Sequence, residues 1–197
     1  MQCQICEVMK KNKLLNIAVI VCKSIRIFII IAFIGLTTIF IHLQISPESY
    51  KKGNIEFKVS GLQISKSNRW KISNSGDDKE VYALNKITKT SLFINYLKFS
   101  AVLFFMFLLI TEFQKIMQSV KNLNTFQKNN VRSFRKIGKY LFIIFLLSSY
   151  FKLRFQQGGM TNFSLNFTPL IFMLIAFILA EIFKEGNLLQ RENDLTI

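Results

Sequence analysis

Four long apolar runs dominate the pattern of the chain, and each contains few or no charged residues. A helix of about 20 apolar residues is long enough to cross the hydrocarbon core of a bilayer. A buried soluble core could explain one such run, but four within 197 residues leave too little polar chain to cover them. We therefore predict an all-α integral membrane protein with four transmembrane helices, over about residues 25–44, 91–112, 137–154 and 168–184.

The third run is the weakest of the four. Its uncharged centre, Tyr140–Phe151, holds only 12 residues, so Lys139, Lys152 and Arg154 would have to reach the membrane interfaces from its ends. The first run is followed by Gln44–Glu48, which lacks a small-x-small cleavage pattern. We interpret the first run as an uncleaved membrane anchor.

Basic residues outnumber acidic ones by 26 to 11, which gives a net charge of +15. In a soluble protein this excess would suggest nucleic acid binding. Here the bases lie between apolar runs, where they act as topology signals and contact anionic lipid headgroups, so we expect no direct nucleic acid binding.

The distribution of Lys and Arg predicts the orientation in the membrane. With four spans, one side holds 5 bases in residues 1–26, 7 in residues 112–139 and 2 after Ala180. The other side holds 9 in residues 44–92 and 2 in the loop before the fourth span. This small bias predicts a multi-pass protein of the cell inner or plasma membrane with both termini in the cytoplasm.

Residues 46–90 are predicted to form a small β-rich extracytoplasmic segment. Apolar and polar residues alternate around Ile55, Phe57 and Val59, and further short alternating stretches extend to Leu84 between turn-forming residues. A small hairpin alone would be marginally stable. Residues 162–167 alternate strictly, so we expect them to form a strand beside residues 54–72. Thr168 then suits the N-cap of a fourth helix that starts at Pro169.

Residues 113–136 are predicted to form a cytoplasmic helical hairpin. One helical face carries five apolar side chains: Phe113, Ile116, Met117, Val120 and Leu123. A second stripe begins with Val131, Phe134 and Gly138. Two interpretations remain open: two helices that leave the bilayer at a slant, or a docking surface for a soluble partner with Arg132, Arg135 and Lys136 on its basic side.

Candidate catalytic and metal-binding residues are few. Cys3 and Cys6 have a metal-like spacing, but zinc needs further ligands, which one distant Cys22 and the single His42 do not supply. No catalytic or nucleotide-binding motif occurs, so we expect neither an enzyme nor a cofactor. Charged residues within or near predicted spans raise the hypothesis of an ion pathway, although each can reach an interface: Lys98, Glu112 and Glu181.

Three segments resemble a known family of small bacterial membrane proteins. They are the C-terminal residues 181–197, the segment Phe126–Gly138, and the segment Phe163–Leu170 with its Thr168-Pro169 pair. The family is catalogued as domain of unknown function 2975, and the resemblance covers about residues 90–197. It implies four spans, no established activity, and frequent encoding beside a small helix-turn-helix transcription regulator of the Xre type.

These observations lead to one functional hypothesis and two alternatives. The chain is expected to be a non-enzymatic sensor or modulator of a cytoplasmic helix-turn-helix regulator, with Glu185, Glu192 and Asp194 of the tail meeting a basic DNA-binding surface. The tail could equally pack on Arg132 and Arg135 of the same chain. The alternatives are a small transporter or channel-like protein, for which a homo-oligomer is one expected form, and a structural membrane component whose basic loops bind anionic lipid.

Overall fold

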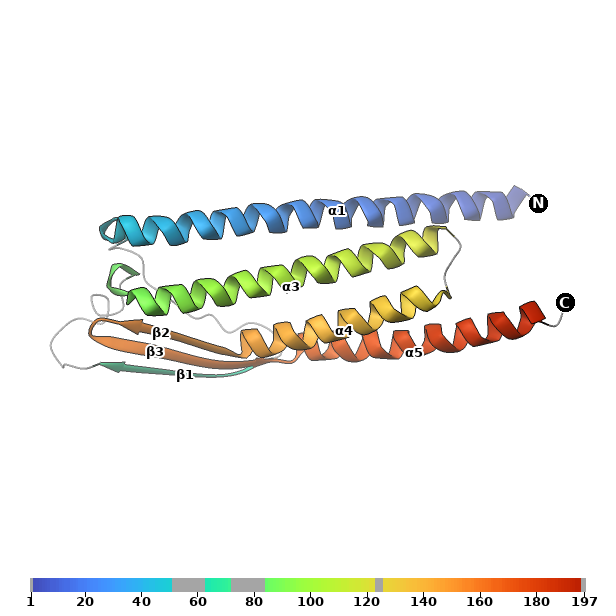
Figure 1. Cartoon of the computed structure of the whole chain (residues 1–197). Helices are drawn as coiled ribbons and strands as arrows, with labels where there is room; N and C mark the ends of the chain where they lie inside the picture. Colours follow the sequence, from blue (N-terminus) through green and yellow to red (C-terminus); the bar gives the residue numbers. More distant parts are fainter. Residues whose placement is uncertain (1, 51–62, 72–83, 123–125, 196–197) are drawn as a thin grey trace. The chain divides into compact units, whose positions relative to one another are not determined.

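The computed structural model describes residues 2–50, 63–71, 84–122 and 126–195 (Figure 1). Within these residues the chain is mostly helical, with four α-helices and one small three-stranded sheet. The elements in chain order are α1 (Gln2–Ile45), the 3₁₀ helix η1 (Pro47–Tyr50), β1 (Gln63–Lys71), the 3₁₀ helix η2 (Leu84–Lys86), α3 (Lys89–Lys121), α4 (Lys128–Ser149), β2 (Tyr150–Phe155), β3 (Gly158–Asn166) and α5 (Thr168–Leu195).

Two helices are long and apolar enough to cross a membrane, judged by length and composition. They are the part of α1 from Lys13 to Ile45 and the whole of α3. Few side chains within their most apolar stretches are buried against the rest of the protein. Phe28 in α1, for example, is 70% exposed, and Leu97 in α3 is 61% exposed.

The described residues fall into two compact units. The first contains residues 1–30, 105–143 and 169–197, and the second contains residues 31–104 and 144–168. The first unit therefore groups the described parts of the N-terminal half of α1 and of α5 with the end of α3 and the start of α4, whereas the second contains the sheet.

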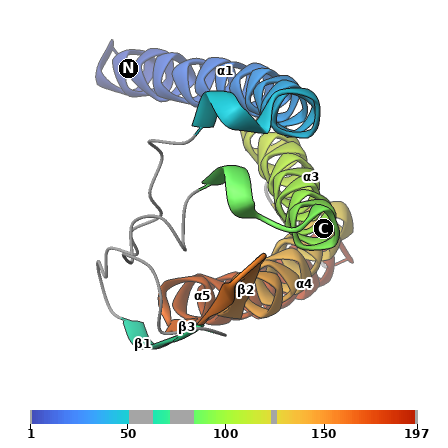
Figure 2. The same ribbon diagram turned by 90° about the vertical axis from the view of Figure 1, so that its left-hand side faces the viewer.

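The sheet is antiparallel, with β3 in the centre between β1 and β2, an order that can be followed in Figure 2. Asn162 of β3 pairs with Ser67 of β1, and Asn166 pairs with Gln63. The prediction that residues 162–167 form a strand beside residues 54–72 is therefore confirmed for residues 162–166, which pair with residues 63–67. The predicted strand around residues 55–59 lies outside the described residues, as do residues 81–83, while Leu84 begins η2.

The end of the third predicted span is wrong. The helix expected to reach residue 154 ends at Ser149, and Tyr150 begins β2. Along β2, the buried Leu153 and Phe155 alternate with the exposed Lys152 and Arg154. This period of two is that of a half-buried strand, and pairing with β3 satisfies the backbone groups that a continued helix would have satisfied internally.

A polar stripe on α3 lies along the edge of β2 that faces away from β3, beyond the bridge between Ile87 and Phe155. The Ser91 hydroxyl accepts a hydrogen bond from the Arg154 amide at 3.0 Å, and the Asn95 side chain donates to the Lys152 carbonyl at 2.9 Å. Lys98 donates to the Tyr150 carbonyl. Four helical residues rise about 6 Å, close to the length of two strand residues, so one helix face matches alternate residues of β2. Lys98 therefore has a structural role in this sheet.

The core of the first unit lies between α3, α4 and α5. Ile116, only 1% exposed, packs with Val131, Phe134 and Ile137 of α4. Two small side chains of α5, Ala176 and Ala180, complete the cluster, and Met117 and Val120 pack against it. Much of the predicted apolar stripe on residues 113–123 is therefore used inside the protein; Leu123 lies outside the described residues.

Helix α5 begins at Thr168, one residue before the predicted start at Pro169, and continues to Leu195. The side-chain oxygen of Asn166 accepts a hydrogen bond from the Thr168 amide at 3.0 Å, one of the amides that a helix start leaves without an internal partner. The tail from residue 184 to residue 195 is therefore a continuation of α5.

Candidate functional site

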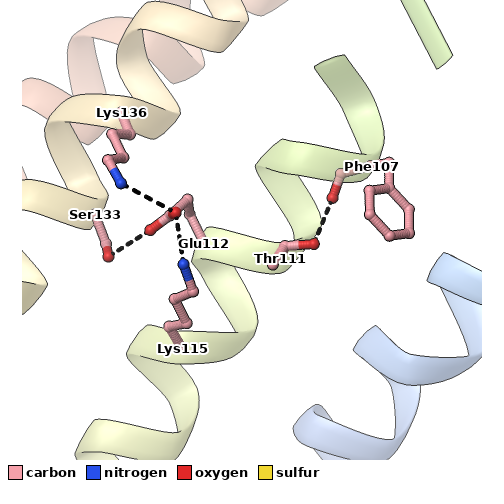
Figure 3. A network of polar contacts seen from close by, with 6 residues as sticks. All are labelled: Phe107, Thr111, Glu112, Lys115, Ser133 and Lys136. Carbon is pink, nitrogen blue, oxygen red and sulfur yellow. Dashed lines mark hydrogen bonds and ion pairs between the residues drawn. The ribbon is translucent and has the colours of Figure 1, made fainter. Parts of the chain in front are cut away.

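A buried carboxylate joins α3 to α4. Glu112 is 6% exposed, and three side chains surround it (Figure 3). Its Oε1 atom is 2.8 Å from Lys115 Nζ and 3.4 Å from Lys136 Nζ. Its Oε2 atom accepts a hydrogen bond of 2.7 Å from the Ser133 hydroxyl.

Helical spacing accounts for this arrangement. Lys115 follows Glu112 by three residues on α3, and Lys136 follows Ser133 by three residues on α4, so each pair shares one helix face. The packing of Ile116 against α4 brings the two faces together. Both lysine side chains remain about half exposed, so the centre has one buried negative charge and two positive charges that reach solvent.

A polar pocket of about 390 Å³ lies beside the carboxylate. Its walls come from the end of α3 and the start of α4: Glu112, Lys115, Ser119, Gln127, Asn129, Asn130, Arg132, Ser133 and Lys136. Asn130 is 2% exposed and donates to the Ser119 hydroxyl at 2.9 Å. Within the described part of the chain, Arg132 makes neither a hydrogen bond nor an ion pair. The pocket therefore offers positive charge and hydrogen-bond donors to an acidic group.

Arg26 is a structural residue that the sequence reasoning missed. Its guanidinium donates to the side chain of the buried Gln114 at 3.1 Å and lies 4.8 Å from the centre of the Phe107 ring. These contacts fix α1 to α3 beside the Glu112 centre. The available signal was an arginine at the start of an uncharged run together with two glutamines, Gln114 and Gln118, near the end of the following apolar helix.

Some of the charged residues predicted to form the functional site on α4 and α5 contact one another, and others do not. Arg135 and Glu181 form an exposed ion pair at 3.5 Å, and Lys184 also pairs with Glu181. Arg132 and Lys136 line the pocket with Glu112, whereas Lys98 lies in the other compact unit.

The structure describes two of the three acidic side chains predicted to act on the tail. Glu185 and Glu192 are exposed on α5. The side chain of Asp194 lies outside those that the structure describes.

The start of the tail contacts the turn before α4. The Asn187 side chain donates to the Phe126 carbonyl, and the Phe126 ring lies 5.5 Å from the Phe183 ring. A Cβ atom on Gly186 would come within 2.4 Å of the Phe126 ring, so this close approach depends on glycine. The tail therefore packs on its own chain at residues 186–187, against Phe126, whereas its packing on Arg132 and Arg135 stays a prediction.

The candidate metal-binding residues do not meet in the described part of the chain. Cys3 and Cys6 lie in α1, and their side chains are outside those that the structure describes. Cys22 is buried, and His42 is exposed near the end of α1. Among the described residues no three His, Cys, Asp or Glu side chains form a group that could hold a metal ion.

The matches to known proteins concern the C-terminal part of the chain. No curated protein and no solved structure matches the chain. The model of one family, described as "Protein of unknown function (DUF2975)", matches residues 77–197, which include α3, α4, β2, β3 and α5. The resemblance noted at residues 126–138, 163–170 and 181–197 is therefore confirmed, and the Glu112 centre lies within the matched part. The chain belongs to this family of proteins of unknown function.

Proposed function

We propose that the chain is a four-span protein of the cell inner or plasma membrane that modulates a cytoplasmic helix-turn-helix transcription regulator without enzymatic activity. The membrane location of the chain is supported by which side chains are exposed and which are buried. Large apolar side chains are exposed along three helices, including Leu14, Phe28, Leu97 and Ile178, while polar side chains such as Glu112 and Asn130 are buried. In water this pattern would expose far more apolar surface than a monomer tolerates, whereas in lipid it is favourable.

The grouping of segments supports an orientation with both termini in the cytoplasm. The first compact unit contains residues 1–30, the α3–α4 turn and the end of α5, which are the segments that the distribution of bases predicts to be cytoplasmic. The sheet and the segment between α1 and α3 belong to the second unit, and they would lie outside the cytoplasm.

The polar pocket beside Glu112 is the observation that carries the regulatory function. Because Ile116 and its apolar neighbours pack inside the protein, a partner would meet polar groups at this hairpin. Arg132 and Lys136 offer positive charge to an acidic group of the partner. Glu185 and Glu192 are exposed on α5, where they would complement the basic DNA-binding face of a helix-turn-helix protein. The identity of the partner class rests on the family resemblance.

Co-purification with a helix-turn-helix regulator from the native cell tests the proposal. The full chain is tagged at its N-terminus, which leaves Ile197 free, and is solubilised in a mild detergent. We expect the regulator to be recovered with the wild type and its recovery to fall about tenfold in the Glu185→Gln/Glu192→Gln variant, because two charge-complementary contacts are lost. Mass spectrometry of the eluate measures the recovery.

Glu181→Gln is the matched control, because Glu181 is an exposed acid on the same helix that already pairs with Arg135 and Lys184. The recovery of the regulator with this variant should equal its recovery with the wild type. Absence of the regulator from every preparation would contradict the proposal, as would ion-dependent flux through liposomes that disappears in a Glu112→Gln variant. The latter result would favour the transporter alternative.

A further inference from the structure

A second and larger pocket lies between β2 and the first turns of α3. Its volume is about 710 Å³, within the range of small-molecule sites in proteins. All its wall residues belong to the second compact unit: Trp70, Thr88, Thr90, Ser91, Ile94, Tyr150, Lys152, Arg154 and Phe155. The wall thus combines aromatic and aliphatic surface with hydroxyl groups and two positive charges.

The sheet register explains why the indole ring lies over this face. Trp70 of β1, Gly159 of β3 and Arg154 of β2 form one row across the sheet. A Cβ atom on Gly159 would come within 2.6 Å of the Trp70 ring, so only glycine leaves room for the ring to cross the central strand. The row places Trp70 and Arg154 on the same sheet face. Lys152 precedes Arg154 by two residues on β2 and therefore lies on this face as well.

The two cations of this pocket lack partners among the described residues. The backbone groups of Lys152 and Arg154 are bonded to Asn95 and Ser91, which anchors β2. Their side chains, by contrast, make no hydrogen bond or ion pair with any residue that the structure describes. Among the residues that the structure describes, no acidic one lines the pocket. A solvated lysine and a solvated arginine next to apolar surface can bind a ligand that has both an anionic group and an apolar part.

We propose that this pocket binds an anionic phospholipid. The phosphate group accepts hydrogen bonds from Lys152, Arg154 and the Thr90 hydroxyl. The glycerol and the first part of an acyl chain pack on Trp70, Ile94 and Tyr150. Basic residues beside tryptophan and tyrosine are the combination that membrane proteins place at the lipid headgroup level. This inference rests on the membrane location in the proposed function and is independent of the regulator.

The sequence contains a single tryptophan, so Trp70 reports on the pocket without further labelling. The full chain in a neutral detergent is titrated with phosphatidylglycerol that carries brominated acyl chains, and quenching of the Trp70 emission is measured. Brominated phosphatidylcholine of the same chain length and free glycerol phosphate are titrated in parallel. We expect saturable quenching with phosphatidylglycerol and binding that is at least about tenfold weaker with phosphatidylcholine, because the net negative charge is lost. Glycerol phosphate, added before the brominated lipid, should not compete at comparable concentration.

Variants of the two cations separate charge recognition from folding. Lys152→Gln/Arg154→Gln should weaken phosphatidylglycerol binding about tenfold or more. The exchange Lys152→Arg/Arg154→Lys keeps both charges and should retain binding within about threefold. Lys66→Gln/Lys89→Gln removes two charges of the same unit that do not line the pocket, and it should bind like the wild type.

Three results would overturn this assignment. The first is equal quenching by phosphatidylglycerol and phosphatidylcholine, which would indicate lipid around the protein without recognition of charge. The second is competition by glycerol phosphate as strong as that by the lipid, which would indicate a phosphate site with no role for the apolar wall. The third is unchanged binding in the Lys152→Gln/Arg154→Gln variant. Each outcome is independent of whether a regulator co-purifies.

Discussion

Replacing Glu112 by leucine is expected to lower the free energy of unfolding of the detergent-solubilised protein by about 2–4 kcal/mol. The substitution removes the acceptor of three donors at once: the Ser133 hydroxyl and the ammonium groups of Lys115 and Lys136. Ser133 is buried, so its hydroxyl would lose its partner in a place with little access to water. Both lysines are half exposed and regain solvent, so the effect is smaller than for a fully buried ion pair.

The loss is measured as a fall in the midpoint of thermal or detergent-induced unfolding of the purified chain. Glu181→Gln serves as the control, because Glu181 also pairs with two bases but is exposed, and it should leave the midpoint unchanged. A double variant, Glu112→Leu/Lys136→Leu, should recover part of the loss because no unpaired ammonium remains at that position. Equal midpoints for Glu112→Leu and the wild type would refute a structural role for this carboxylate.

The double substitution Ser91→Ala/Asn95→Leu is expected to detach β2 from α3, at a cost of about 2–4 kcal/mol. Both side chains are buried, and they satisfy the Arg154 amide and the Lys152 carbonyl at the edge of β2 that faces away from β3. Without them these two backbone groups would face an alanine and a leucine that cannot form hydrogen bonds. The other backbone contacts on this side of β2 lie at its end, where Thr88 donates to the Arg154 carbonyl and Ile87 bridges Phe155, so the part of the strand before Arg154 should open locally.

Hydrogen exchange followed by mass spectrometry measures this opening directly. Peptides that cover β2 should lose protection in the double variant, while peptides from the Glu112 centre keep theirs. Thr111→Val is the matched control on the same helix, because among the described residues its hydroxyl bonds only to the Phe107 carbonyl one turn earlier (Figure 3). That carbonyl also accepts the normal helical bond, so the control should behave like the wild type. Unchanged exchange along β2 in the double variant would show that other contacts hold this edge.

The local periodicity of the sequence predicted much of the fold. The apolar runs marked the helices, and the strict alternation at residues 162–167 identified β3 together with its partner β1. The end of α4 could not be predicted in the same way. Residues 150–155 are mostly apolar or aromatic and follow an apolar helix directly, so their composition fits either a helix or a strand. Only the pairing with β3 decides between the two.

The sites depended on contacts between distant residues that no local pattern encodes. Glu112 and Lys136 were both singled out, but their meeting depends on the register between α3 and α4. Asn95 contacts Lys152 across 57 residues. Lys98 was interpreted as an intramembrane charge because it lies within the second apolar run, and its contact with the Tyr150 carbonyl depends on a strand that had been assigned to a helix. Arg26 was not singled out, because its partner Gln114 lies 88 residues away.

The side of the membrane that the α3–α4 turn faces is the most direct test of the proposed function, because a cytoplasmic regulator can reach only a cytoplasmic hairpin. In a background with Cys3, Cys6 and Cys22 replaced by alanine, single Lys66→Cys and Arg132→Cys variants are treated with a membrane-impermeant maleimide in intact spheroplasts. We expect Lys66→Cys to be labelled at once and Arg132→Cys to be labelled only after the membrane is permeabilised. Labelling of Arg132→Cys in intact spheroplasts would contradict the proposed orientation and the contact with a cytoplasmic regulator.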